Sequence, residues 1–298
     1  MPSSDQVREL LDFATVLAHE AGALTLRNFG GLVDHDAKSD GSPVTIADRE
    51  AEELIRRRVE QRFPEHSILG EEYGESNAGA PVRWILDPID ATRSFMRGVP
   101  LYGVLIGIEI EAESVVGVAH FPPLQETIAA GLGLGCTRNG DPCEVSPVEA
   151  IERAVICTTD VERILARPEG NGWRRLQQRC LFSRTWGDCY GHALVATGRI
   201  EAQVDPVAAS WDAGPFLTIA TEAGGRFTTL EGDVTVHGGA QAEDVEALVR
   251  AWGARTEWPE VERLARTEAR PGADVVLRSA EDLPVIGLGR VGEGWTAA

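Results

Sequence analysis

Apolar residues recur at helical spacing in two stretches near the start of the chain. The first stretch indicates a long helix that ends near Phe29-Gly30-Gly31 and packs one face on a core. The second opens at Thr45, because Thr45 and Asp48 have the spacing of a capping box. The two apolar faces consist of Val7, Leu10, Leu11, Ala14, Leu17, Ala18, Ala21 and Leu24, and of Ala47, Ala51, Leu54, Ile55, Val59 and Phe63.

Continuous apolar runs follow and predict strands. They cover residues 67–70, 82–86, 101–110, 114–121 and 126–132, and Asn139-Gly140 marks a hairpin turn. The second half alternates between both patterns, with strands predicted over 154–159 and 200–205 and helices over 173–179, 186–197 and 216–223. From about residue 238 the pattern weakens to a helix over 244–252 and a strand over 273–277.

Acidic residues stand where the predicted strands end. Glu71 and Glu72 follow the strand over 67–70, and Asp87 and Asp90 follow the strand over 82–86. Pro88 restricts the backbone between the two aspartates, so we expect a stiff turn there. Oxygen ligands beside free backbone N–H groups suit Mg²⁺ and a phosphate. Taken alone, an Asp-Pro turn that caps a helix explains the same residues.

Composition narrows the class of protein. The chain has 298 residues, 43% of them hydrophobic, which is enough for one large domain or two ordinary ones. Its formal net charge of −19 argues against nucleic acid and anionic membranes as partners. The five cysteines include no CxxC pair, which indicates reduced thiols, and neither a signal peptide nor a membrane span is indicated. We expect a cytoplasmic protein.

Four blocks of the chain, each weak alone, form a strong signal together. In order they are Ser42-Pro43-Val44-Thr45-Ile46-Ala47-Asp48, Gly70-Glu71-Glu72, Asp87-Pro88-Ile89-Asp90-Ala91-Thr92 and Trp211-Asp212-Ala213-Gly214. Over roughly residues 5–237 the chain thereby resembles the inositol monophosphatase superfamily of metal-dependent phosphatases. The blocks most similar to its histidinol-phosphatase branch are Ser94-Phe95 with Gly98-Val99-Pro100, Gly187-Asp188-Cys189-Tyr190 and Val204-Asp205-Pro206.

The resemblance implies a fold and a domain organisation. The expected fold is a layered α/β (αβαβα) sandwich of the inositol monophosphatase and fructose-1,6-bisphosphatase type. Residues 1–237 would form the phosphatase core. Residues 238–298 would form a divergent segment, because the usual continuation after Val236-His237-Gly238-Gly239 is absent. We expect this segment to pack on the core. A homodimer is a further possibility that the resemblance leaves open.

The resemblance also implies a metal centre with two or three Mg²⁺ ions. Its ligands would be Glu71, Asp87, Asp90, Asp212 and the carbonyl of Ile89. Carboxylates gathered in one place repel one another unless cations occupy the site. Glu71 and the Thr92 hydroxyl would orient or deprotonate the attacking water, and Asp48 would support a more weakly held metal. Without the resemblance, Asp48 and Asp212 are explained as acids at helix starts.

The implied substrate is a small phosphomonoester, with L-histidinol phosphate favoured. The substrate-binding residues would be Asp90, Ala91, Thr92, Arg184, Asp188 and Asp205. Asp188 and Asp205 lie beyond the metal ligands and favour a cationic group, whereas Arg184 is equally explained as a surface residue.

Two alternatives stay open at this stage. One is hydrolysis of inositol-1-phosphate, and the other is a metal-binding regulatory protein with reduced turnover. The second is motivated by Ala91, which stands where the superfamily normally has glycine, and by the altered C-terminal segment.

Overall fold

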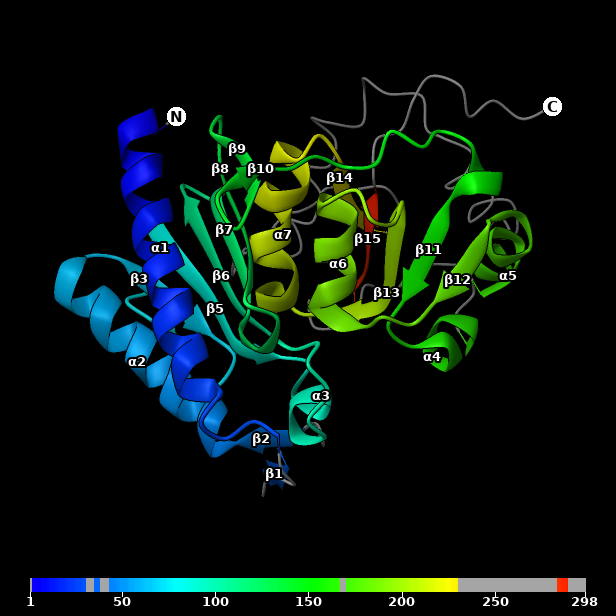
Figure 1. Cartoon of the computed structure of the whole chain (residues 1–298). Coiled ribbons are helices and arrows are strands. Elements are labelled where there is room, and N and C mark those ends of the chain that lie inside the picture. The colour runs from blue at the N-terminus through cyan, green and yellow to red at the C-terminus, as the bar shows by residue number, and fades with distance from the viewer. Residues whose placement is uncertain (1, 31–34, 38–42, 167–169, 230–282, 289–298) are drawn as a thin grey trace, which may run out of the picture.

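A computed structural model describes residues 2–30, 35–37, 43–166, 170–229 and 283–288. Two sheets and three groups of helices are stacked in alternating layers (Figure 1). Helices α1 (Ser4–Thr25) and α2 (Ile46–Arg62) cover the outer face of the first sheet. Helices α6 (Asp188–Ala196) and α7 (Ser210–Glu222) lie between the sheets, and α4 (Val161–Ala166) and α5 (Gly170–Arg179) lie beyond the second. The predicted αβαβα layering is confirmed.

The first sheet has eight strands in the spatial order β10-β9-β8-β7-β6-β5-β3-β4. Only the β3–β5 pair is parallel among its described strands. In spatial order the bounds are Asp141–Pro142, Gly135–Arg138, Glu126–Gly131, Glu113–Phe121, Gly103–Ile110, Val82–Asp90, Ser67–Gly70 and Gly74–Ser76. The hairpin predicted at Asn139-Gly140 joins β9 to β10.

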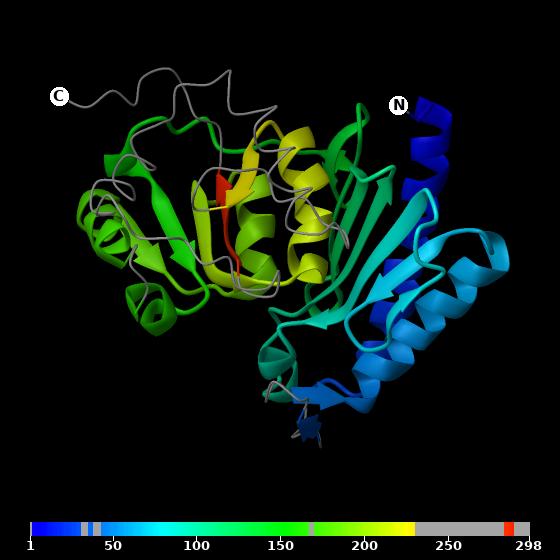
Figure 2. The same ribbon diagram turned by 180° about the vertical axis from the view of Figure 1, so that it is seen from behind.

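The second sheet has the order β12-β11-β13-β15-β14. Its bounds in that order are Phe182–Arg184, Val155–Thr158, Ala202–Ala208, Leu283–Leu288 and Arg226–Thr229. Strand β15 comes from the segment after residue 237 and pairs antiparallel with both neighbours, as Figure 2 shows from behind. The domain boundary at residue 237 stays a prediction, and the helix over 244–252 and the strand over 273–277 lie outside the described residues.

Short elements complete the chain. Strands β1 (His35–Ala37) and β2 (Pro43–Thr45) form a separate ribbon, and α3 (Thr92–Met96) follows β5. Two 3₁₀ turns occupy Pro122–Leu124 and Ile151–Arg153. None of the helices in the described part of the chain is long and apolar enough to cross a membrane.

Both predicted N-terminal helices bury the expected faces. Val7, Leu10, Ala14, Leu17, Ala18 and Ala21 of α1 are buried, as are Ala47, Ala51, Ile55 and Val59 of α2. The capping box at the start of α2 is present: Asp48 Oδ2 accepts from the Thr45 N–H at 2.8 Å. Local spacing therefore predicted these elements correctly.

Three element boundaries differ from the predictions by four residues or more. Helix α1 ends at Thr25, before the expected end near Phe29. Strand β5 continues through Asp87 and Pro88 to Asp90, with a register shift against β6 in place of the expected turn. Pro88 lacks an N–H, which suits a bulge. Helix α7 begins at Ser210, six residues before the predicted start, and contains Pro215. Pro215 has no N–H, so α7 lacks the hydrogen bond to the carbonyl four residues earlier.

Glycine lets α7 lie close to the first sheet. A Cβ on Gly117 of β7 would lie 2.0 Å from the carbonyl oxygen of Pro215. Any larger residue there would push α7 away from the sheet. The close packing brings the start of α7 to the end of β5, where the candidate site lies.

Candidate active site

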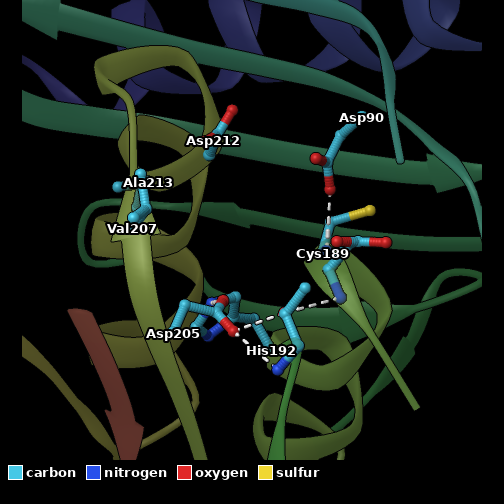
Figure 3. Close-up of a pocket in the computed structure, with 10 residues that line it drawn as sticks. Asp90, Cys189, His192, Asp205, Val207, Asp212 and Ala213 are labelled. Atoms are coloured by element: carbon cyan, nitrogen blue, oxygen red, sulfur yellow. Dashed lines mark hydrogen bonds and ion pairs between the residues drawn. The ribbon is translucent and has the colours of Figure 1, made fainter. Parts of the chain in front are cut away.

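Strand β5 carries two aspartates of the site across its irregular end. Asp87 is 2% exposed, and its Oδ1 accepts the backbone N–H of Ile89 at 3.0 Å. Asp90 is half-buried, and its Oδ2 accepts the N–H of Cys189, at the start of α6, at 2.7 Å (Figure 3). The bulge between the two aspartates turns both carboxylates toward the same region.

Helix α7 supplies the third aspartate from its first turn. Asp212 Oδ2 accepts the N–H of Ala209 at 2.8 Å, which satisfies a donor at the helix start. Asp212 therefore has the capping position expected from sequence. It also faces β5, because α7 packs on that sheet.

Carboxylate oxygens of Asp87, Asp90 and Asp212 all lie within 4.8 Å of one another. Burial and the repulsion of neighbouring carboxylates raise the pKa of Asp87 well above its usual range. Burial and the charge of Asp212 raise the pKa of Asp90 to about 7. Burial raises the pKa of Asp212 to about 7 as well, and the charge of Glu71 adds to this. Gathered acids with raised pKa values and hard oxygen donors fit a divalent cation.

Glu71 lies beside this cluster because of sheet pairing. Strand β3 runs parallel to β5, and the N–H of Glu71 donates to the carbonyl of Leu86 at 3.2 Å. This places Glu71 next to the strand position that Asp87 occupies. Its charge raises the pKa of both Asp87 and Asp212, so the predicted fourth carboxylate does lie near the other three.

Glu52 of α2 shapes the turn that carries Glu71. The Glu52 side chain is fully buried and pairs with the Arg56 Nε at 2.7 Å. Its two oxygens accept the N–H of Glu72 at 2.8 Å and the N–H of Tyr73 at 3.3 Å. Sequence reasoning missed Glu52. The signal was an acid on the apolar face of α2, four residues after Asp48.

Thr92 lies close to two other predicted residues, Ile89 and Asp48. The Thr92 hydroxyl donates to the Ile89 carbonyl at 3.1 Å and lies 3.5 Å from Oδ1 of the fully buried Asp48. Ala91 has left-handed backbone angles, φ 70° and ψ 46°. That conformation costs a residue with a Cβ about 1–2 kcal/mol. The loop at Ala91 thus keeps the backbone geometry that glycine favours, although alanine occupies it.

A pocket opens beside the acidic cluster, toward the second sheet (Figure 3). Its lining consists of Asp90, Thr159, Asp188, Cys189, His192, Asp205, Val207, Ala208, Asp212 and Ala213. Four of these ten residues are aspartates, and none is lysine or arginine. Burial, with the charges of Asp90 and Asp205, raises the pKa of Asp188 to about 8. Such a pocket favours a cationic ligand.

Arg184 lies apart from that lining. It is exposed on β12, where its guanidinium donates to the Ser183 carbonyl at 2.7 Å and stacks over the Phe182 ring. Its contact with a substrate stays a prediction. Asp205 lies in the middle of β13, because this strand continues to Ala208 beyond the predicted end at residue 205. The other predicted residues are gathered at the ends of β3 and β5 and at the starts of α2, α3, α6 and α7.

Thr159 and His192 are pocket residues that sequence reasoning missed. His192 is 6% exposed, and its Nε2 lies 2.7 Å from Asp205 Oδ2. Thr159 donates to the same carboxylate from the end of β11. Each residue lies in a segment that was predicted from its apolar neighbours, so the sequence offered no sign of a functional role. Only the contact with the Asp205 carboxylate indicates that role.

This layered fold and its acidic cluster indicate the class of metal-dependent phosphatases. The family model described as "Inositol monophosphatase family" matches residues 6–264, and the chain belongs to this family of phosphoric monoester hydrolases. The chain is 44% identical to the histidinol-phosphatase of Chlorobaculum parvum over 216 residues, covering 72% of this chain and 83% of that protein. It is 34% identical to the histidinol-phosphatase of Mycobacterium tuberculosis over 245 residues, covering 77% and 91%. These similarities assign it to the histidinol-phosphatase branch.

Solved structures agree on the fold. An inositol monophosphatase from Anabaena (Nostoc) sp. PCC 7120 aligns with a TM-score of 0.68 and 28% identity, covering 77% of this chain and 87% of that one. The extragenic suppressor protein suhB from Bartonella henselae aligns with a TM-score of 0.75 at 24% identity, covering 88% and 100%. The layered architecture is therefore shared with this family.

Proposed function

We propose that the chain is a Mg²⁺-dependent phosphomonoesterase whose substrate is L-histidinol phosphate. The observation that carries the choice of substrate is the pocket beside the acidic cluster, because its lining holds Asp188 and Asp205 in addition to the metal-type acids. An ester whose alcohol bears a protonated amine would complement these carboxylates. The names of the two histidinol-phosphatase relatives support the same substrate.

The chain's own groups hold the cation or act on the water, and Glu71 does both. Glu71, Asp87, Asp90, Asp212 and the Ile89 carbonyl would hold two or three Mg²⁺ ions. When bound, Mg²⁺ supplies Lewis acidity that polarises the phosphate and acidifies water. The Glu71 carboxylate and the Thr92 hydroxyl would orient the attacking water, and the Glu71 carboxylate would take up its proton.

The remaining groups position these two and the substrate. Asp48, buried beside Thr92, would hold that hydroxyl in place. Backbone N–H groups near Ala91 and at the start of α7 would donate to the phosphate oxygens. As the water oxygen bonds to phosphorus, the ester P–O bond breaks, and the leaving alcohol oxygen takes a proton from solvent. No covalent enzyme intermediate is needed.

Hydrolysis of inositol-1-phosphate is the second candidate. The 28% identical structure from Anabaena carries the name inositol monophosphatase, and the acidic cluster suits either ester. Neutral inositol hydroxyls can hydrogen-bond to Asp188 and Asp205, but they do not neutralise the charge of those carboxylates. The pocket therefore favours the amine.

Phosphate release from both esters, with Mg²⁺ and with EDTA, tests the proposal. We expect activity only with Mg²⁺ and a higher kcat/KM for L-histidinol phosphate. Asp90→Asn should lower turnover by orders of magnitude, since a metal-holding carboxylate is lost. Asp141→Asn, an exposed change on β10, is the matched control. Full activity in EDTA would refute the metal dependence, and equal efficiency for both esters would refute the choice of substrate.

A further inference from the structure

The hydroxyl of Thr159 connects two aspartates that line the pocket. Thr159 is half-buried directly after β11, opposite the start of α6. Its Oγ1 lies 2.5 Å from Asp205 Oδ1, 2.9 Å from the backbone N of Asp188 and 3.3 Å from Nε2 of Gln203. Three separate elements, β11, β13 and α6, thus meet at one oxygen atom.

The donor and acceptor capacities of these groups decide which atom donates each hydrogen bond. A hydroxyl has one proton and two lone pairs, whereas a backbone N–H and an amide NH₂ can only donate. Asp188 and Gln203 therefore donate to Thr159, and the Thr159 proton goes to Asp205. The hydroxyl is fully used, so each of its three partners depends on it.

Asp205 is occupied by the protein itself. Its Oδ1 accepts the Thr159 hydroxyl, the Thr159 N–H at 3.2 Å and the Gln203 amide at 2.5 Å. Its Oδ2 lies 2.7 Å from Nε2 of His192, and the residue is 6% exposed. A carboxylate with four such contacts has little accepting capacity left for a ligand.

Asp188 lines the same pocket, but its carboxylate differs from that of Asp205 in its hydrogen bonding. Among the described residues, none forms a hydrogen bond or an ion pair with its carboxylate, although it lines the pocket. Burial raises the pKa of Asp188, and the charge of the exposed Arg93 opposes this shift without forming an ion pair with it. Asp188 is thus the pocket carboxylate with accepting capacity for a cation.

The backbone of Asp188 needs external support. Its φ is 49° and that of Gly187 is 32°, both in the left-handed range. A strained residue of this kind costs about 1–3 kcal/mol and persists only where its surroundings hold it. The bond from the Asp188 N–H to Thr159 and the bond from the Cys189 N–H to Asp90 are two such supports.

We propose that Thr159 is a positioning residue that aims the Asp188 carboxylate at the cationic amine of the substrate, with Asp205 as its anchor. The inference rests on the proposed function for the identity of the amine. It reassigns Asp205 from a direct contact of the substrate to a support behind Asp188. Specificity for an amine-bearing phosphate ester then depends on a hydroxyl that does not touch the ester.

The experiment compares three single variants. Thr159→Val has nearly the same shape but no hydroxyl, and Thr159→Ser keeps the hydroxyl. Thr158→Val is the matched control, since Thr158 is the preceding residue, is fully buried and has a hydroxyl without a hydrogen-bond partner among the described residues. For each variant the ratio of kcat/KM for L-histidinol phosphate to that for inositol-1-phosphate is measured.

We expect Thr159→Val to lower that ratio by about 10-fold, mainly through KM, as for the loss of one charge-assisted hydrogen bond. Thr159→Ser should keep the ratio within about threefold of the parent value, and Thr158→Val should leave the ratio unchanged. A merely structural role for Thr159 would reduce both efficiencies in proportion, with an unchanged ratio. That result would overturn the inference.

Hydrogen exchange of the Asp188 amide separates this inference from the proposed function. Thr159→Val should speed its exchange by about 10-fold or more, because the N–H loses its acceptor, and Thr159→Ser should not. Unchanged exchange in Thr159→Val would overturn the positioning role whatever the substrate is. A parent protein without any preference for L-histidinol phosphate would instead overturn the proposed substrate, and with it the amine as the target of Asp188.

Discussion

Oδ2 of Asp90 accepts the backbone N–H of Cys189 at 2.7 Å, across a separation of 99 residues. The bond joins the end of β5, in the first sheet, to the start of α6, which lies between the sheets. Asp90 therefore belongs to both the acidic cluster and the pocket. A cation held at the cluster and a substrate held in the pocket would meet at this residue.

Removal of one acid should separate a metal site from a chance gathering of carboxylates. In the metal-free protein, the cluster of Asp87, Asp90 and Asp212 destabilises the fold by repulsion. Asp90→Asn removes one charge at constant size, so its melting temperature in EDTA should equal or exceed that of the parent. Mg²⁺ should raise the melting temperature of the parent far more than that of the variant, because the ion binds only the folded site.

Thermal melts of both proteins with EDTA and with Mg²⁺ measure this difference. Asp141→Asn serves as the control for an aspartate outside the site. A variant that is less stable than the parent in EDTA, together with no response of either protein to Mg²⁺, would show that Asp90 is only structural.

The pH dependence of stability should follow the raised pKa values. The pKa values of Asp90 and Asp212 are about 7 in the folded protein, against 3.8 ordinarily. The folded state thus holds protons that the unfolded state releases, and stability falls as pH rises from about 4 through 7. The stability of the metal-free parent relative to Asp90→Asn should therefore decrease over this range.

The effect of Mg²⁺ should run in the opposite direction. Binding must displace the extra protons, so the rise in melting temperature caused by Mg²⁺ should grow between about pH 5 and pH 8. Melts at several pH values, with and without EDTA, give both trends. A difference between parent and variant that does not change with pH would contradict the assignment of raised pKa values to these carboxylates.

Ala91→Gly should stabilise the protein by about 1 kcal/mol, because φ is 70° and glycine adopts that angle without strain. Activity should be equal or higher, since the backbone of the phosphate loop keeps its conformation. Ala112→Gly is the matched control, as Ala112 has φ 65° in the exposed turn between β6 and β7. It should gain similar stability without any change in activity. A large loss of activity in Ala91→Gly alone would mean that the rigidity conferred by the Cβ is required.

Glu52→Gln should destabilise the protein by about 2 kcal/mol and weaken its response to Mg²⁺. The buried Glu52 carboxylate holds Arg56 and the N–H groups of Glu72 and Tyr73, and a neutral amide satisfies these donors less well. The turn that carries Glu71 then loses part of its support.

Denaturant unfolding and Mg²⁺-dependent melts test both effects. Glu53→Gln is the control, since Glu53 is exposed and accepts the Tyr73 hydroxyl of the same turn at 2.6 Å. It should change stability by less than about 0.5 kcal/mol. Equal behaviour of the two variants would contradict a supporting role for Glu52.

The sequence determined the elements whose bonds join residues close in the chain. The capping box between Thr45 and Asp48 spans three residues, and the buried faces of α1 and α2 repeat at helical spacing. Both depend on local geometry alone, so spacing predicts them. The four ordered motifs identified the layered fold and the acids of the cluster by resemblance, before any contact between those acids was visible.

The tertiary structure decided which of these groups meet and which are already occupied. The extension of β5 through Pro88 depends on pairing with β6, and the close approach of α7 to the first sheet depends on Gly117. The saturation of Asp205 depends on Thr159, which directly follows another strand. Asp188 keeps its accepting capacity because no hydrogen bond or ion pair of the described residues reaches its carboxylate. Such contacts follow from sheet register and from the placement of helices between two sheets. Residue spacing does not encode that placement, because it results from the packing of the whole core.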